Sequence, residues 1–272
     1  MLPDPETVRQ RDPALVTRIV SALILIPVSL FLLWNGGLAF TAYCAAFAAA
    51  MAWEWMRMAD RDAPTRSYAI ASAAASGAVL FAADGEFFWM LGWPLAGAIG
   101  VSLTGDMPLA RRWRGAFGIL YVALAVSALA SLRALNGFNA AAFILLVVWA
   151  ADSAAYFAGT WLRGPKLWPR ASPNKTWSGL IAGIAGGVAA AWGFAQWQNE
   201  PVLGTMIAGL ILALAAVAGD LAMSLFKRLF GVKDTGEIIP GHGGVLDRVD
   251  ALMAACLAAL VMASLNVLEG PL

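Results

Sequence analysis

Long apolar runs separated by short polar turns extend along almost the whole chain. A helix needs roughly 20 apolar residues to cross the hydrocarbon core of a bilayer. Two longer polar segments, Leu162–Ser178 and Lys227–Arg248, interrupt the pattern and are dense in Gly, Pro, Lys and Asp. The pattern predicts an all-α, polytopic helical bundle with about nine transmembrane helices, at residues 17–34, 37–58, 68–83, 87–104, 115–132, 139–161, 179–197, 202–226 and 249–268. The third and fourth are the weakest, because they are rich in Ala and Gly or interrupted by Pro94.

Composition excludes the other broad classes of protein. Hydrophobic residues make up 61% of the chain and charged residues 13%, whereas soluble domains carry about 45–50% apolar and about 25% charged residues. Disorder needs low hydrophobicity and nucleic-acid binding needs a basic footprint, so both are excluded. Cys44 and Cys256 lie in apolar runs and predict no disulfide framework. The polar segment 1–13 is not expected to be a cleavable signal peptide, and residues 1–272 are predicted to form a single membrane domain.

The basic residues show which side of the membrane each loop faces. With the N-terminus inside, the inside segments hold every Lys and Arg except Arg133. Lys and Arg near the ends of spans are retained on the cytoplasmic side. The distribution therefore predicts that both long polar loops are cytosolic and that Leu272 lies outside.

Charged residues gather where the eighth and ninth predicted spans meet the cytosol. Asp220, Ser224 and Lys227 share one helical face, and Asp247 and Asp250 share another, because residues three or four apart lie on the same side of a helix. The loop between these helices is rich in Gly and carries Lys233, Asp234 and the single histidine, His242. Carboxylates suit Mg²⁺, while Gly, Lys and Arg suit phosphate, so the pattern indicates Mg-nucleotide handling. The alternative is that these charges are interfacial anchors or solvated loop residues, and His242 more often has a structural role in such a loop.

Two further groups of polar residues precede this cluster. Ser172, Lys175 and Thr176 come just before a helix expected to start near Trp177, where hydroxyls and helix N–H groups could meet a phosphate. The segment lacks P-loop spacing, and a simple helix cap is equally consistent with it. Asp152 lies deep in an apolar span, where ionisable groups tend to be functional, although it could simply bridge helices. Glu54, flanked by tryptophans near an interface, favours a structural role.

At these residues the chain resembles the phosphatidate cytidylyltransferases, the CDP-diacylglycerol synthases. The resemblance rests on SLFKR at 224–228, Lys233-Asp234 and PGHGGVLDRVD at 240–250, with WAADSAAYFAG and SPNKTWSG in the middle of the chain and looser matches near the start. It covers most of the chain, and the diagnostic part lies in residues 136–272 rather than 1–135. Two positions depart from the pattern, because Ser178 and Met223 stand where many members have Glu, and neither is assigned a role.

The resemblance implies an integral enzyme, expected in a bacterial inner (plasma) membrane with its active site facing the cytoplasm. It would join CTP to phosphatidic acid, a membrane lipid, releasing pyrophosphate. Mg²⁺, a possible accompanying K⁺ and a homodimer are also implied. On this basis Asp220 and Asp247 are expected to bind Mg²⁺, with Asp250 as a third or outer ligand. The expected substrate-contacting residues are Lys227, Arg228, Lys233 and Arg248 for phosphates, His242, Gly243, Gly244, Ser224 and Asp234 around the glycine-rich loop, and Lys175, Ser172, Thr176 and Asp152 from the middle of the chain.

Two alternatives stay open at this point. A related membrane kinase using CTP, such as a polyprenol or phytol kinase, would have similar metal needs but a neutral alcohol acceptor, which requires a general base. A cation-coupled secondary transporter would use Asp152 and Asp220 as ion sites, although the sequence has no internal repeat of the kind many transporters show. The loop dense in Lys, Asp and Gly favours an enzyme.

Overall fold

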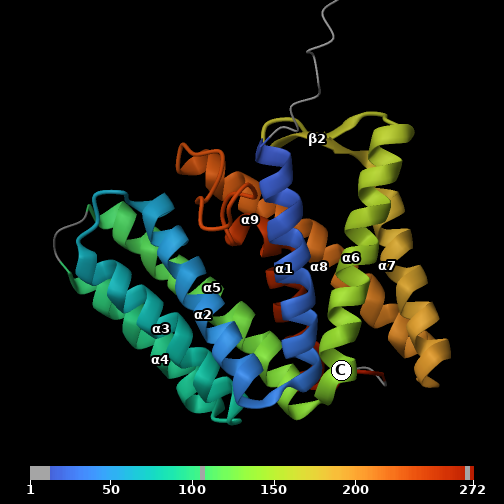
Figure 1. Cartoon of the computed structure of the whole chain (residues 1–272), viewed down its shortest axis with the longest axis horizontal. Helices are drawn as coiled ribbons and strands as arrows, with labels where there is room; N and C mark the ends of the chain where they lie inside the picture. Colours follow the sequence, from blue (N-terminus) through green and yellow to red (C-terminus); the bar gives the residue numbers. More distant parts are fainter. Residues whose placement is uncertain (1–12, 105–107, 267–269) are drawn as a thin grey trace, which may run out of the picture.

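The computed structural model describes residues 13–104, 108–266 and 270–272, and within them the chain is a bundle of nine helices with one short hairpin (Figure 1). The basic residues Arg9 and Arg11, which entered the charge argument, lie outside these ranges. The elements in chain order are α1 (Pro13–Asn35), α2 (Gly37–Ala59), α3 (Thr65–Ala83), α4 (Phe87–Leu103), α5 (Leu109–Leu135), α6 (Gly137–Trp161), β1 (Lys166–Trp168), β2 (Ser172–Thr176), α7 (Trp177–Gln198), α8 (Val202–Leu229) and α9 (Leu246–Leu265).

Each predicted span coincides with one helix of the bundle, which confirms the all-α class. Six helices of the described residues are long and apolar enough to cross a membrane, namely α1, α5, α6, α7, α8 and α9. Helix α4 is apolar but shorter, and α2 and α3 are not among the six. Helix α3 consists largely of Ala, Ser and Gly, whose small side chains give low hydropathy. The number of membrane crossings therefore stays a prediction, while the membrane character of the chain is supported.

Small residues let neighbouring helices approach closely in the second half of the chain. A Cβ added at Gly183 of α7 would lie 3.1 Å from the carbonyl oxygen of Ala151 on α6. At Gly186 the added atom would come within 2.6 Å of the Ala154 Cβ. Between apolar helices in lipid, association depends on such close packing rather than on a hydrophobic driving force. The α6–α7 pair therefore fixes the position of the polar residues at its end.

Two hydrophobic clusters form the interior of the bundle. One is built mainly from α2, α3 and α5, and the other mainly from α6, α8 and α9, and both include buried residues of α5 and α9. Leu129 of α5 packs against both clusters. Helices α5 and α9 therefore join the two halves of the chain into one body.

Both polar segments lie at the same end of the bundle, and the C-terminus lies near the opposite end (Figure 1). Residues 162–178, expected to be a loop, form an antiparallel hairpin in which Lys166 pairs with Thr176 and Trp168 with Ser172. Helix α7 begins at Trp177, as the sequence predicts. The common position of the two segments agrees with the expectation that they face the same compartment.

Candidate functional site

Asp247, at the first turn of α9, joins three parts of the polar end. Its Oδ1 accepts a hydrogen bond from Lys227 Nζ of α8 at 2.8 Å. Its Oδ2 accepts from the backbone N–H of Thr235 at 2.9 Å, from the Thr235 hydroxyl at 3.0 Å and from the Gly244 N–H at 3.3 Å. Both carboxylate oxygens therefore have protein partners, and Asp247 fixes the loop between α8 and α9.

Glu54 of α2 holds the same loop from the other side. Its side chain is 1% exposed, and its two oxygens accept from the backbone N–H groups of Val245 and Leu246, each at 2.9 Å. The Thr235 hydroxyl lies 3.4 Å from Glu54 Oε2. A carboxylate at a helix N-terminus satisfies orphan N–H groups and interacts favourably with the helix dipole. The expected structural role of Glu54 is thus fulfilled inside the site, not at an interface.

Gly244 lies so close to the side chains of Thr235 and Glu54 that only a glycine fits at this position. A Cβ there would lie 2.1 Å from the Thr235 hydroxyl oxygen and 2.9 Å from Glu54 Oε2. No side chain fits into this space without displacing the two anchors. Thr235, which is 4% exposed, and Glu54 were both missing from the predicted site. Their burial depends on the meeting of α2 with a loop some 180 residues later, for which the sequence holds no local signal.

A second charged group combines residues of α6, α8, α9 and the hairpin. Lys175 at the end of β2 forms an ion pair with Asp220 of α8. Asp152 of α6 and Asp250 of α9 both interact electrostatically with Asp220 and Lys175. The backbones of α8 and α9 touch here, because a Cβ at Gly219 would lie 2.9 Å from the Asp250 carbonyl oxygen. The structure therefore brings together four predicted residues from separate parts of the chain.

The donor chemistry of this second group fits a hard cation. Within the described residues no cluster of three or more acidic, His or Cys side chains is close enough to enclose a metal alone. Mg²⁺ is usually held by only one or two carboxylates and completed by water and substrate phosphates. Asp250 has a single hydrogen bond within the described chain, from the N–H of Ala251 at 2.9 Å. Asp220 and Asp250 are therefore better suited than Asp247, whose oxygens are already engaged.

One of the hydroxyl residues before α7, Thr176, caps the helix. Thr176 is the N-cap, and its hydroxyl accepts from the Gly179 N–H at 3.1 Å. Ser178 donates to the Arg163 carbonyl and lies 3.0 Å from the Thr176 hydroxyl. Ser172 begins β2 and is half-buried. Of this predicted group, only Lys175 reaches the acidic residues, and the capping alternative describes Thr176.

His242 and Arg248 order the end of the glycine-rich loop against α1. The Nδ1 of His242 lies 2.8 Å from the Ser21 hydroxyl of α1. The His242 carbonyl accepts from Arg248, with the Nε at 2.9 Å, and Arg18 donates to the Gly241 carbonyl at 2.8 Å. His242 therefore has the structural partners of a loop residue. Gly243 adopts a positive φ of 86°, which favours glycine.

Four other predicted residues, Ser224, Arg228, Lys233 and Asp234, belong to neither of the two charged groups described above. Ser224 is half-buried on α8, one turn after Asp220, whereas Arg228, Lys233 and Asp234 are exposed. Lys233 and Asp234 line a polar pocket beside the loop. Met223 is 1% exposed in the hydrophobic interior, which agrees with the absence of an assigned role.

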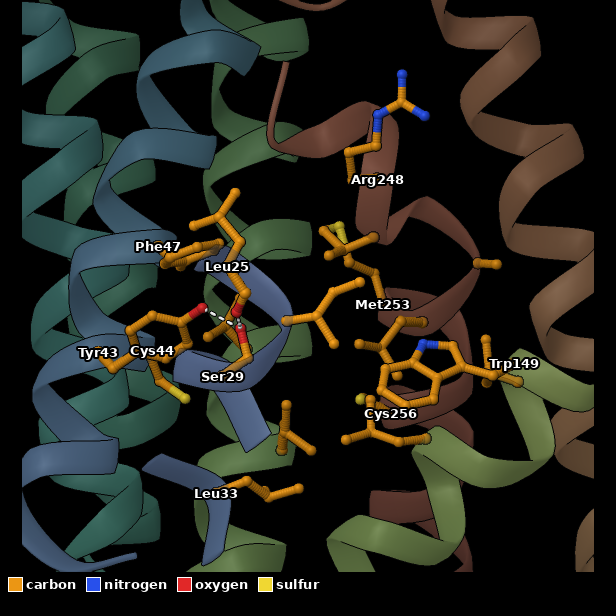
Figure 2. Close-up of a pocket in the computed structure, with 18 of the residues that line it drawn as sticks. Leu25, Ser29, Leu33, Tyr43, Cys44, Phe47, Trp149, Arg248, Met253 and Cys256 are labelled. Carbon is orange, nitrogen blue, oxygen red and sulfur yellow. Dashed lines mark hydrogen bonds between the residues drawn. The ribbon is translucent and has the colours of Figure 1, made fainter. Parts of the chain in front are cut away.

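An apolar cavity of about 410 Å³ opens beneath the polar end. Its walls come from α1, α2, α5, α6 and α9, and Figure 2 shows Leu25, Phe47, Met253 and Trp149 lining it, with Arg248 at the upper end. Inside it, the hydroxyls of Ser29 and Tyr43 form a hydrogen bond of 2.5 Å (Figure 2). Asp152 and His242 also line it. The cavity therefore offers an apolar volume that ends at charged residues.

Comparison with known proteins identifies one family and several relatives that share one name. Residues 16–266 match the model of the cytidylyltransferase family. A phosphatidate cytidylyltransferase from Brucella suis biovar 1 (strain 1330) is 40% identical over 246 residues, covering 89% of this chain and 90% of that protein. The protein of the same name from Pseudomonas aeruginosa is 34% identical over 271 residues, covering 91% of this chain and 97% of its own. One from Haemophilus influenzae is 47% identical over 119 residues, covering 42% of this chain and 41% of its own.

Proposed function

The chain belongs to the cytidylyltransferase family, and we propose that it transfers the cytidylyl group of CTP to phosphatidic acid at the polar end of the bundle. Relatives that align with most of the chain are named phosphatidate cytidylyltransferase. The products are CDP-diacylglycerol, a precursor for phospholipid synthesis, and pyrophosphate. The observation that carries the proposal is the apolar cavity itself, whose lining also includes the polar side chains of Asp152, His242 and Arg248.

The cavity suits a lipid whose phosphate stays at the polar end. Its walls are aliphatic and aromatic, and Arg248 stands at one end (Figure 2). An arginine fork recognises phosphate oxygens with directional, charge-assisted hydrogen bonds. We assign the cavity to an acyl chain of phosphatidic acid, with Arg248 beside the lipid phosphate. Asp152, which also lines the cavity, then faces the same reacting region.

The chemistry needs alignment and charge neutralisation more than proton transfer. A phosphate oxygen of phosphatidic acid attacks the α-phosphorus of CTP, and the bond from that phosphorus to the β-phosphate oxygen breaks. A phosphate monoester has a second pKa near 6, so it is largely dianionic at neutral pH. No general base is required, which agrees with the loop-ordering contacts of His242. Lys227 and Lys175 reduce the repulsion between the two polyanions and hold them in position.

Asp220 and Asp250 would hold Mg²⁺, since these interacting carboxylates each keep an oxygen without a hydrogen-bond partner among the described residues. When bound, the ion neutralises phosphate charge and polarises the phosphorus being attacked. Lys175 sits against Asp220 and keeps that carboxylate oriented. Asp247 contributes indirectly by fixing Lys227 and the glycine-rich loop. An accompanying K⁺ stays an expectation from the resemblance.

The polar end is proposed to face the cytoplasm of a bacterial cell, where CTP is available. Both polar segments lie at one end of the bundle (Figure 1), and almost all basic residues flank that end in the charge pattern. The relatives are bacterial, which agrees with an inner-membrane location. The homodimer implied by the resemblance stays a prediction.

The position of a radioactive label in CTP tests the reaction directly. Purified protein in detergent is incubated with Mg²⁺, CTP labelled at either the α- or the γ-phosphate, and either phosphatidic acid or a lipid alcohol. Cytidylyl transfer places only the α-label in the lipid product, and a CTP-dependent kinase acting on a lipid alcohol places only the γ-label there. A transporter would label no lipid. Absence of an α-labelled lipid from the wild-type reaction would overturn the proposal.

A further inference from the structure

A second, polar pocket lies beside the glycine-rich loop. It has a volume of about 520 Å³ and is formed by the C-terminal end of α2, the turn that follows it and the loop after α8. The basic residues that line it are Arg57, Arg61 and Lys233. Two exposed acids, Asp234 and Glu237, also line it, so the charged side chains leave a net charge of +1.

Among the described residues, the cations of this pocket form no ion pair. In the part of the chain that the structure describes, the ion pairs join Arg111 to Asp60, Lys175 to Asp220 and Lys227 to Asp247. None of the three pocket cations takes part in them, and none has a side-chain hydrogen bond to a described residue. Three unpaired cations around one concave polar surface favour binding of an anion with several charges.

The pocket shares a wall with the site described above. Thr235 and Gly243 line it, and Thr235 also donates to Asp247, which pairs with Lys227. Lys227 lies seven residues after Asp220 on α8, about 10 Å along the helix axis at 1.5 Å per residue. The order along the polar end is therefore the Asp220–Asp250 group, then Lys227 with Asp247, then the pocket.

We infer that the pocket formed by Arg57, Arg61 and Lys233 binds the β- and γ-phosphates of CTP and holds them as the departing pyrophosphate. The inference rests on the proposed function and assigns a nucleotide-binding role to α2, in the half of the chain that carries few diagnostic motifs. Glu54 lies one turn before Arg57 on α2 and anchors the loop that carries Lys233. Glu54 therefore fixes the position of the loop after α8 relative to the end of α2, and these two segments form the pocket.

The test is the double variant Arg57→Gln/Arg61→Gln, which removes both charges but keeps a polar side chain that can donate hydrogen bonds. The expected result is a rise of about tenfold or more in the KM for CTP, because each charge-assisted hydrogen bond contributes more than an ordinary one. The inhibition constant for added magnesium pyrophosphate rises in parallel, while the KM for phosphatidic acid in mixed micelles stays within twofold. The control is Arg66→Gln/Arg112→Gln, which removes two charges outside the pocket, where both residues bond to backbone carbonyls.

The outcomes distinguish binding of the CTP phosphates from binding of a lipid headgroup. An unchanged KM for CTP and unchanged inhibition by pyrophosphate overturn the inference. A rise confined to the KM for phosphatidic acid also overturns it and assigns the pocket to a lipid headgroup. If the double variant does not purify as folded protein, Lys233→Met, an exposed loop substitution, decides by the same criteria. Absence of α-label transfer by the wild type would instead refute the proposed function.

Discussion

At the scale of single residues, the three aspartates expected to bind metal have different surroundings. Asp247 uses both oxygens for Lys227, Thr235 and Gly244. Asp220 and Asp250 lie where α8 and α9 touch, and they retain oxygens without hydrogen-bond partners among the described residues. Spacing along the sequence placed Asp247 and Asp250 on one helical face but could not show which of them a loop would engage. The division of roles depends on tertiary contacts.

Asp220→Asn keeps the size of the side chain and removes the charge proposed to hold Mg²⁺. We expect turnover to fall by about 100-fold or more, as for removal of one group that stabilises transition-state charge. The remaining activity should need more Mg²⁺, which a titration of rate against Mg²⁺ concentration measures. The substitution also leaves Lys175 unpaired, so the double variant Asp220→Asn/Lys175→Met is made in parallel.

Recovery of activity in that double variant would show that only the ion pair had mattered. Asp84→Asn, in the turn between α3 and α4, is the matched control and should behave as the wild type. Near-normal activity of Asp220→Asn at low Mg²⁺ would remove this residue from the metal site.

Lys227→Met keeps the aliphatic stem and deletes the ammonium group. We expect a large loss of turnover that added Mg²⁺ cannot restore, because Asp220 and Asp250 are intact. Lys227→Arg should retain part of the activity, since it keeps the charge beside Asp247. Steady-state kinetics for both substrates, with thermal unfolding to confirm folding, provide the measurement. Wild-type kinetics in Lys227→Met would exclude a phosphate contact.

At the scale of elements, the start of α9 depends on a carboxylate from a distant helix. Glu54 accepts from Val245 and Leu246, the first N–H groups of α9. The sequence predicted the helices and their order, because hydrophobic length is a local signal. It did not predict the hairpin of residues 166–176 or the anchoring by Glu54. Both depend on pairing between segments, which the pattern of apolar residues does not encode.

Glu54→Gln is predicted to loosen the glycine-rich loop. The amide places an N–H donor where the carboxylate accepts from backbone N–H groups, and an unsatisfied buried group costs about 1–3 kcal/mol. We expect faster proteolytic cleavage within residues 230–245 and a lower turnover. Asp60→Asn breaks the other buried acidic contact near the end of α2, with Arg111, and serves as the control. Equal cleavage rates in Glu54→Gln and wild type would contradict the anchoring role.

At the scale of the whole molecule, the two halves of the chain share one site. Helices α1 and α2 supply cavity walls and loop contacts, while the reactive charges come from α6, α8, α9 and the hairpin. Asp152, Lys175, Asp220 and Asp250 all belong to residues 136–272, where the motifs lie. Residues 1–135 carry few such motifs, because cavity walls need only apolar volume. Their contribution becomes visible only when the helices are assembled.

Ala22→Phe is predicted to narrow the apolar cavity from α1. Ala22 lines the cavity, so a phenyl group there competes with an acyl chain. We expect the KM for phosphatidic acid to rise several-fold, with the KM for CTP unchanged. Leu23→Phe, at a neighbouring residue that is 67% exposed and does not line the cavity, is the matched control. Equal lipid kinetics in the two variants would contradict the assignment of this cavity to the lipid.

We propose that cytidylyl transfer occurs at the charged group formed by Asp152, Lys175, Asp220 and Asp250. The most direct measurement follows CDP-diacylglycerol and pyrophosphate together, in one detergent reaction, for the wild type and Asp220→Asn. We expect the wild type to form equal molar amounts of the two products, both dependent on phosphatidic acid and Mg²⁺. The folded Asp220→Asn variant should form almost none of either product. Pyrophosphate released without nucleotide-linked lipid, or undiminished product formation by Asp220→Asn, would contradict the account.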